Sequence, residues 1–197
     1  MKKFLHKYFG PTKWKRLFDI VVSFVALVIL SPLFLIICLI NLFTPDCKVF
    51  FSHERRGRRG KPFTIYKFQT MKNSTPNCAT GELENPDQYI TKFGRILRKT
   101  SLDELPQLWN ILKGDMSFVG PRPPLPNEVE QYTEEQKRRL SVTPGLTCYW
   151  QVQPSRNDLD FDEWFELDMK YIRERSMKID IKIIFQTILV VLHMEGV

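Results

Sequence analysis

The chain has 197 residues, a length that suits one domain with at most a small appendage. Its formal net charge of +7 indicates an anionic partner, which could be a nucleic acid, a membrane surface or a phosphorylated substrate. The four cysteines have no paired spacing and the three histidines are scattered. The sequence therefore argues against a disulfide framework, a zinc site and a histidine metal cluster, and it indicates a reducing compartment.

A long apolar run follows a basic leader at residues 1–16. The run extends from Leu17 to Phe43, which is too long for a signal peptide. At about 1.5 Å per residue it could span a bilayer core of about 30 Å. Pro32 near its middle would interrupt a helix, and the Ser31 hydroxyl can donate to a carbonyl freed in the preceding turn. We therefore predict a break at Ser31-Pro32.

Basic residues flank both ends of this run, at Lys13–Arg16 and at Arg55–Lys61. Because short basic flanks stay on the cytoplasmic side, both ends are expected there. We predict a re-entrant helix that enters the membrane, turns and leaves by the same face; a kinked single span is the alternative. Residues 1–47 would form this membrane anchor and residues 48–197 a cytosolic domain, the two acting as one functional unit.

Two strand-like runs, at 48–52 and 62–70, flank the basic connection 55–61 and predict a β-hairpin. The connection is expected to face solvent or to bind anionic lipid headgroups. A nucleic-acid arm is disfavoured because no aromatic stacking ladder accompanies it. A polar loop at 72–88 and a short basic helix at 93–99 follow. The cations of that helix could neutralise the carboxylates after it, or they could hold a diphosphate.

Those carboxylates are Asp103 and Glu104. Ser101 and Glu104 have the spacing of a capping box that starts a helix, and Gly114 would end this helix. Asp103 would lie in its first turn, ionised by the helix dipole and close to N–H groups that suit a phosphate. Apolar residues recur at helical spacing and would pack inward: they are Leu102, Leu105, Leu108, Trp109 and Leu112. Taken alone, the Ser-x-x-Glu pattern is usually just a helix cap, and only the rest of the chain favours a functional role for the two carboxylates.

The C-terminal part begins with a rigid Gly-Pro-Arg-Pro elbow that presents Arg122. We expect, in order, a helix at 127–139, a turn at 143–147, a strand at 148–153 with a polar turn bearing Arg156, and a helix at 161–175. The apolar run 180–193 could close the core or lie in the membrane interface as an amphipathic helix. The predicted fold class is α+β, mostly helical.

Phosphoryl transfer at a membrane surface is the chemistry that these residues favour. The sequence has no Gly-x-x-x-x-Gly-Lys loop, Ser-His-Asp set or dinucleotide-binding glycine pattern, which disfavours a P-loop NTPase, a triad hydrolase and a dinucleotide enzyme. Phosphoryl transfer depends mainly on positioning and charge neutralisation. An aspartate can act as its covalent nucleophile, and Mg²⁺ needs only one or two carboxylates besides substrate phosphates.

The chain resembles the monotopic polyprenol-phosphate phosphoglycosyl transferases, also called bacterial sugar transferases, in their small minimal form. The similarity is carried by motifs over nearly the whole chain: Lys15-Arg16-Leu17-Phe18-Asp19, Ser31-Pro32, Ile65-Tyr66-Lys67-Phe68, Thr70-Met71, Ser101-Leu102-Asp103-Glu104-Leu105-Pro106-Gln107-Leu108, Lys113-Gly114-Asp115-Met116-Ser117, Gly120-Pro121-Arg122-Pro123 and Pro144-Gly145-Leu146-Thr147.

The resemblance implies transfer of a sugar-1-phosphate from a nucleotide sugar, usually a UDP-sugar, to undecaprenyl phosphate with release of UMP. Such a step initiates the synthesis of bacterial surface glycoconjugates or exopolysaccharides. The resemblance also implies a monotopic enzyme on the cytoplasmic face of the bacterial inner membrane, in contact with anionic lipids and without a nucleic acid partner. It does not fix the oligomeric state, and a homodimer is one of the states it allows.

Carried over to this sequence, the resemblance makes Asp103 the nucleophile that holds the phosphosugar and a ligand of Mg²⁺. Glu104 would assist with the metal or with proton handling. The basic residues that match substrate-phosphate positions are Lys67, Arg98, Arg122 and Arg156.

The sequence departs from the family pattern in two places. Gln69 stands where many relatives carry a basic residue, and Pro154-Ser155 precedes Arg156-Asn157 where a glycine is usual. The stretch 147–152 looks more like hexose-1-phosphate enzymes of exopolysaccharide pathways than like those that use diacetamido sugars. The alternative to catalysis is a membrane-anchored basic scaffold in which Asp103-Glu104 is only a helix cap.

Overall fold

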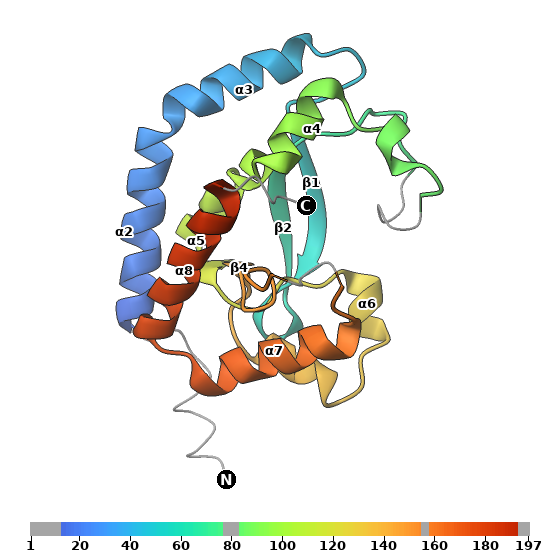
Figure 1. Ribbon diagram of the computed structural model, residues 1–197. Helices are drawn as coiled ribbons and strands as arrows, with labels where there is room; N and C mark the ends of the chain where they lie inside the picture. Colours follow the sequence, from blue (N-terminus) through green and yellow to red (C-terminus); the bar gives the residue numbers. More distant parts are fainter. Residues whose placement is uncertain (1–12, 77–82, 155–157, 193–197) are drawn as a thin grey trace.

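The computed structural model describes residues 13–76, 83–154 and 158–192, and Figure 1 shows their arrangement. The fold is α+β and mostly helical, as predicted. The α-helices are α2 (Lys13–Ile29), α3 (Ser31–Phe43), α4 (Lys92–Lys99), α5 (Gln107–Lys113), α6 (Pro126–Glu130), α7 (Phe161–Glu174) and α8 (Met177–Leu192). The strands are β1 (Phe50–Arg56), β2 (Pro62–Phe68), β3 (Ser117–Val119) and β4 (Gly145–Thr147), and the 3-10 turns are η1 (Arg58–Gly60), η3 (Pro86–Gln88), η4 (Leu102–Glu104) and η5 (Gln136–Ser141).

The apolar run breaks where the sequence predicted. Helices α2 and α3 meet at Leu30 with a bend of 61°. The Ser31 hydroxyl donates to the Val28 carbonyl at 2.8 Å, and Pro32 lies in the first turn of α3, where a helix needs no N–H donor. Among the described helices, none is long and apolar enough to cross a membrane alone, whereas this bent pair together meets the length and composition required. The membrane anchor and its boundary at residue 47 stay predictions.

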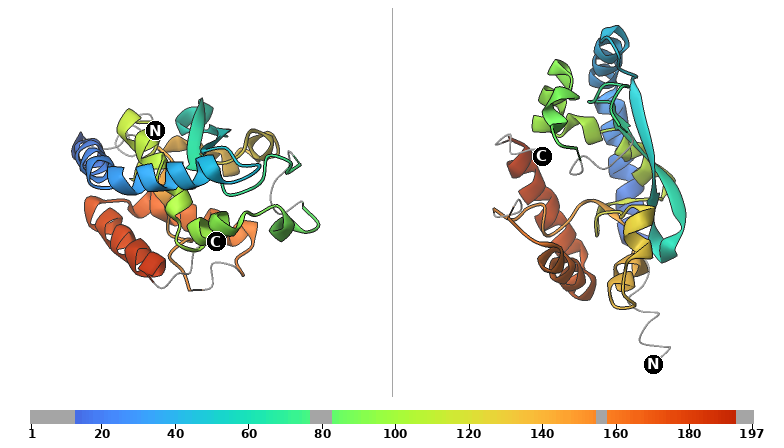
Figure 2. Two further views of the ribbon diagram at one scale, coloured as in Figure 1. Left: turned by 90° about the horizontal axis from the view of Figure 1, so that it is seen from above. Right: turned by 90° about the vertical axis from the view of Figure 1, so that its right-hand side faces the viewer.

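The β-hairpin is confirmed, but its first strand is longer than expected. Strands β1 and β2 pair antiparallel from Phe50 opposite Phe68 to Arg56 opposite Pro62. Arg55 and Arg56, which we assigned to the connection, are therefore strand residues. The hairpin lies on the opposite side of the molecule from α8 (Figure 2, right).

Two sequence predictions near β4 are wrong. Residues 143–147 were expected to form a turn, but residues 145–147 form β4, which pairs parallel with β3; residues 148–153, expected as a strand, form turns. The pairing depends on two glycines far apart in sequence. A Cβ atom on Gly145 would lie 2.1 Å from the backbone nitrogen of Gly120, so only glycine allows this approach.

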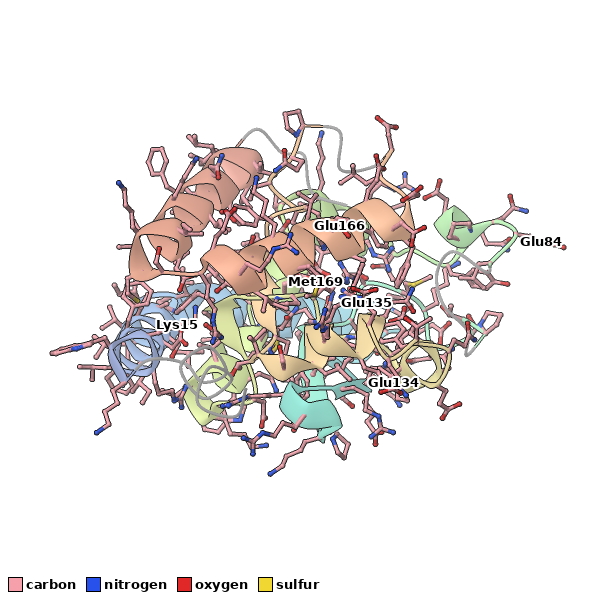
Figure 3. All side chains as sticks on the ribbon, turned by 90° about the horizontal axis from the view of Figure 1, so that it is seen from below. Lys15, Glu84, Glu134, Glu135, Glu166 and Met169 are labelled. Carbon is pink, nitrogen blue, oxygen red and sulfur yellow. The ribbon has the colours of Figure 1, made fainter. Side chains whose placement is uncertain are left out.

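The single helix predicted at 127–139 is divided into α6 and η5. The Thr133 amide donates to Gln136 Oε1 at 2.9 Å, and the Gln136 amide donates to Thr133 Oγ1 at 3.2 Å. This reciprocal pair starts a new helical turn and ends the previous one. Glu135, just before η5, and Glu166 of α7 are both exposed and are labelled in Figure 3.

The C-terminal helices lie close to the bounds predicted, and α8 has two different faces. Its Ile183 is fully buried in a core cluster with Val119 of β3 and Tyr171 of α7. On the other side, large apolar side chains are exposed: they are Ile181, Phe185, Ile188, Leu189 and Leu192. The helix thus closes the core and also presents an uncovered apolar face.

Candidate active site

The Asp103-Glu104 pair lies on a tight turn between α4 and α5, in the 3-10 segment η4. The predicted capping box is wrong, because Ser101 makes no side-chain cap and adopts a left-handed conformation with φ of 55°. Helix α5 begins only at Gln107, since Pro106 has no N–H to continue the helix backwards. Gly114 ends α5 as predicted, with φ of 102°. A left-handed non-glycine residue beside two carboxylates is the kind of local strain found at functional sites.

The residues around this turn anchor it to α3. Leu102 and Leu105 bracket the two carboxylates and pack against the buried cluster of Ile37, Phe68 and Leu97. Trp109, which was predicted to face inward, is instead 54% exposed. The turn is therefore held by the leucines on either side of the carboxylates rather than by a continuous helical stripe.

Glu104 is held by cations. The Lys67 ammonium of β2 lies 2.5 Å from Glu104 Oε1. Burial by itself would raise the pKa of Glu104, but the charges of Lys67 and Arg122 and hydrogen bonds from Lys67 and Gln107 outweigh it, and the pKa lies below its ordinary value. Glu104 is therefore an ionised carboxylate at neutral pH.

Asp103 has the opposite electrostatic character. Burial raises the pKa of Asp103 to about 6, and the neighbouring Glu104 charge adds to this effect, while Lys67 and Arg98 oppose it. No α-helix begins at Asp103, so the predicted stabilisation by a helix dipole is wrong, whereas a pKa of about 6 still leaves the carboxylate mostly ionised at neutral pH, as predicted. Two adjacent carboxylates with pKa values pushed apart are a recurrent feature of acid–base and nucleophilic sites.

Three of the four predicted phosphate-binding residues surround this pair. Lys67 bonds Glu104, as described above. Burial lowers the pKa of the Arg98 guanidinium on α4, and the nearby negative charge of Asp103 partly opposes this effect. Arg98 Nε donates a hydrogen bond to Thr70 Oγ1 at 2.9 Å. The positive charge of Arg122 contributes to the lowered pKa of Glu104, and the Arg122 guanidinium carbon lies 5.9 Å from the centre of the Trp150 ring. Arg156 and the Ser155 half of the Pro154-Ser155 departure lie outside the described residues.

The backbone pairing of β3 and β4 fixes the elbow that carries Arg122. The Gly120 amide donates to the Thr147 carbonyl at 3.0 Å, and the Gly145 amide donates to the Pro121 carbonyl at 3.0 Å. These hydrogen bonds restrain the chain just before Arg122. The close approach of the two glycines thereby positions a functional side chain.

Sequence reasoning missed two residues of this region. Arg55 was assigned to a solvent-facing or lipid-facing connection, yet its Nη1 donates to the Pro123 carbonyl at 3.2 Å, beside Arg122. The fully buried Asn110 of α5 donates to the Thr64 carbonyl at 2.7 Å and accepts from the Tyr66 amide at 3.2 Å. Asn110 therefore ties β2 to α5 just before Lys67. A polar residue within a buried helix face was the available signal for Asn110.

Gln69, the departure from the family pattern, has a structural role. Its side-chain amide donates to the Met71 carbonyl at 2.8 Å and to Asn73 Oδ1 at 2.9 Å. The backbone carbonyl of Gln69 accepts a hydrogen bond from the Asn41 side chain of α3 at 3.0 Å. Gln69 thus joins the end of α3 to the segment after β2.

The carboxylates fit the coordination habits of Mg²⁺ only in part. Residues 13–76, 83–154 and 158–192 contain no group of three or more histidine, cysteine, aspartate or glutamate side chains able to hold a metal. An ion at this turn would therefore need phosphate oxygens besides protein ligands, which is how Mg²⁺ commonly binds. A cation would stabilise the buried charge of Asp103, whereas an oxygen of Glu104 is already bonded to Lys67.

Comparison with known proteins identifies the family to which this sequence is similar. The sequence matches the family described as bacterial sugar transferase over residues 11–194. It is 49% identical over 158 residues to the galactosyl transferase CpsE of Streptococcus agalactiae, covering 74% of this chain and 35% of CpsE. It is 42% identical over 183 residues to the sugar transferase EpsL of Bacillus subtilis, covering 93% of this chain and 89% of EpsL.

A third relative is the undecaprenyl-phosphate galactose phosphotransferase of Salmonella typhimurium, 41% identical over 197 aligned residues that cover 92% of this chain and 41% of that protein. The chain therefore spans less than half the length of CpsE and of the Salmonella protein, and most of EpsL. Because the family match extends over nearly the whole sequence, this chain belongs to the bacterial sugar transferase family.

Proposed function

We propose that this protein is a phosphoglycosyl transferase that moves a sugar-1-phosphate from a UDP-sugar to undecaprenyl phosphate and releases UMP. The name of the Salmonella relative supports the lipid acceptor and a hexose as the sugar. The observation that carries the proposal is the Asp103-Glu104 turn, in which one carboxylate is paired with Lys67 and the other has a pKa of about 6 among cations.

The first half-reaction would use the ionised form of Asp103. An Asp103 carboxylate oxygen attacks the β-phosphorus of the UDP-sugar, and the bond from that phosphorus to the bridging oxygen breaks, so that UMP leaves with the bridging oxygen. The sugar-1-phosphoryl group is then held on Asp103 as an acyl phosphate. Lys67, Arg98 and Arg122 would offset the charge that develops on the phosphate oxygens.

The second half-reaction would regenerate the enzyme. A phosphate oxygen of undecaprenyl phosphate attacks the same phosphorus, and the bond to Asp103 breaks, giving the undecaprenyl diphospho-sugar and a free carboxylate. Burial raises the pKa of Asp103 and the charge of Glu104 adds to this effect, which maintains the basicity of the carboxylate oxygen, while Lys67 and Arg98 oppose it. Mg²⁺ bound by Asp103 and the diphosphate would supply further charge neutralisation.

We further propose that the protein works at the cytoplasmic face of the bacterial inner membrane. Both halves of the bent pair α2–α3 expose large apolar side chains, among them Phe24 at 57% and Phe43 at 80% exposure. The exposed apolar face of α8 is suited to an interfacial position in contact with anionic lipids. Because the leucines beside Asp103 pack on the α3 cluster, a membrane-embedded α3 would hold the carboxylates close to the lipid phosphates.

Release of UMP from a panel of UDP-sugars tests the activity. The panel would include UDP-galactose, UDP-glucose and a UDP-diacetamido sugar, with membranes or detergent-solubilised protein. We expect a burst of about one UMP per protein without lipid acceptor, and continuous turnover when undecaprenyl phosphate is added. The Asp103→Asn variant should show neither the burst nor the mass adduct, whereas the exposed control Asp162→Asn should show both. An adduct on Asp103→Asn would exclude Asp103 as the nucleophile.

A membrane-anchored scaffold without catalysis is the other candidate, and it is favoured by the basic net charge alone. Under this alternative, no UDP-sugar would turn over and Asp103→Asn would change only stability. The membrane topology has its own test: cysteines placed just before Lys13 and just after Phe50 should both react with a probe applied to the cytoplasmic side. Reaction from opposite sides would instead establish a single span.

A further inference from the structure

Arg55 lies on the same face of the hairpin as Lys67. Residues directly opposite each other in an antiparallel pair lie on one side of the sheet, and side chains alternate along each strand. Phe51 pairs with Lys67 and Arg55 pairs with Phe63, so Arg55 and Lys67 share a face, with the buried Ile65 between Lys67 and Phe63. Arg55 therefore belongs to the side of the hairpin that meets the Asp103-Glu104 turn.

Two hydrogen bonds fix the end of β1 against the elbow. Arg55 Nη1 donates to the Pro123 carbonyl at 3.2 Å, and the Arg56 amide donates to the Pro124 carbonyl at 2.9 Å. Consecutive residues of β1 thus bond consecutive residues of the elbow. This arrangement holds the Arg55 guanidinium beside Arg122, one residue before Pro123.

The two guanidinium groups are not neutralised by a carboxylate of their own. Within the described residues, Arg55 Nε is buried and has no hydrogen-bond acceptor, and the ion pairs include none for Arg55 or Arg122. Burial and the charge of Arg122 lower the pKa of Arg55, while the nearby acids Glu128 and Glu104 raise it. Glu104 is already committed to Lys67 at 2.5 Å. Two guanidinium groups in this setting have donors available for an anion.

We propose that Arg55 and Arg122 together bind one phosphate group of the reaction, as a paired guanidinium site on the Glu104 side of the Asp103-Glu104 turn. The inference rests on the proposed function, because the phosphate would come either from the UDP-sugar or from undecaprenyl phosphate. Paired arginines present planar forks of donors that match phosphate oxygens, and a lysine cannot reproduce this geometry. Arg55 would thereby become a substrate-binding residue instead of a lipid-facing one.

Binding of UDP to the Asp103→Asn protein tests the site without chemistry. By titration calorimetry in buffer with Mg²⁺, Arg55→Gln should weaken UDP binding about 10- to 100-fold if the site takes the donor diphosphate, as expected for lost hydrogen bonds between charged groups. Arg55→Lys should weaken it less, because the charge remains. Arg59→Gln, which alters an exposed arginine of the same hairpin, should leave binding unchanged.

The two half-reactions distinguish the sources of the phosphate. In the protein with Asp103 intact, a slower UMP burst in Arg55→Gln assigns the site to the UDP-sugar, whereas a normal burst followed by slow transfer to undecaprenyl phosphate assigns it to the lipid. If Arg55→Gln folds with an unchanged melting temperature and matches Arg59→Gln in UDP binding and in both half-reactions, the inference is wrong. If Arg55→Gln does not fold, Arg55→Lys decides, and wild-type behaviour in all three assays would overturn the proposal. Absence of UMP release from the wild-type protein, with UDP binding still sensitive to Arg55, would instead refute the proposed function alone.

Discussion

Replacing Asp103 by asparagine should stabilise the folded protein while abolishing its activity. Burial makes the ionised Asp103 carboxylate unfavourable, and its pKa rises from 3.8 to about 6. At about 1.4 kcal/mol for each pH unit, this difference corresponds to about 3 kcal/mol of folding free energy lost at neutral pH. Asparagine has nearly the same shape and no charge to bury, so it should recover most of that amount.

The pH dependence gives the effect a definite sign. A carboxyl whose pKa is higher in the folded protein than in the unfolded chain leaves stability intact below the unfolded value and reduces it as the pH rises through the folded value. The increase in the free energy of unfolding caused by Asp103→Asn should therefore be near zero at pH 3.8 or below, grow up to about pH 6 and stay constant above it. For a chain of this size, about 3 kcal/mol raises the melting temperature by about 6–12 °C.

Thermal melting of the detergent-solubilised protein in EDTA, between pH 4 and pH 8, measures this difference. Glu104→Gln is the matched contrast, because Lys67 and Arg122 hold the pKa of Glu104 below its ordinary value despite its burial. Its charge adds stability above the unfolded pKa, so Glu104→Gln should lower the melting temperature at neutral pH and leave Lys67 without its partner. An Asp103→Asn protein that melts below wild type at pH 7.5, or a Glu104→Gln protein that melts above it, would refute the electrostatic reasoning.

Three further predictions concern the supports of the site. Asn110→Ala should lower the free energy of unfolding by about 2–4 kcal/mol in denaturant titrations, because it leaves the Thr64 carbonyl and the Tyr66 amide without their buried partner; an effect below about 0.5 kcal/mol would contradict this role. Gly145→Ala should prevent β3 and β4 from pairing, since its Cβ would lie 2.1 Å from the nitrogen of Gly120, whereas Gly60→Ala, with open space around it and φ of 71°, should cost only about 1 kcal/mol by thermal melting. Lys67→Met should reduce the rate of the UMP burst about 10²- to 10³-fold, as for other losses of a positioned charge, and a burst at the wild-type rate would show that Lys67 serves only the fold.

The elements that the sequence predicted correctly are those with a local signal. Pro32 predicted the break in the apolar run, and two strand-like runs on either side of a basic connection predicted the hairpin. The helix at 161–175 begins with a capping box formed by Asp160 and Glu163, and the structure places α7 at Phe161–Glu174. Each of these signals acts within one or two turns of the chain, so no knowledge of distant partners was needed.

The elements that were predicted wrongly depend on distant partners or on competing local signals. The strand at Gly145–Thr147 pairs with β3, and the backbone of Gly120 approaches Gly145 so closely that no side chain fits there, which no local pattern reveals. The capping box at Ser101 has the expected spacing, but Pro106 prevents a regular helix from starting there. Arg55 was missed because the end of β1 was placed too early, and this error removed the alternation that puts it on the face of Lys67.

The break at Ser31-Pro32 has a consequence for the site itself. Helix α2 is bound to the end of α5, the helix that follows the Asp103-Glu104 turn. Arg16 donates to the carbonyls of Ile111 and Leu112 there, at 2.6 and 2.7 Å. Helix α3 is bound to the residues before and around the turn: Asn41 donates to the Gln69 backbone carbonyl, and Ile37 belongs to the cluster that supports the Asp103-Glu104 turn. A straight helix of this length would diverge from one of these contacts, and the 61° bend allows one apolar run to make both. The proline that shapes the predicted membrane anchor therefore also fixes where α3 meets the catalytic turn, so a change in the bend should alter the position of Asp103 as well as the topology.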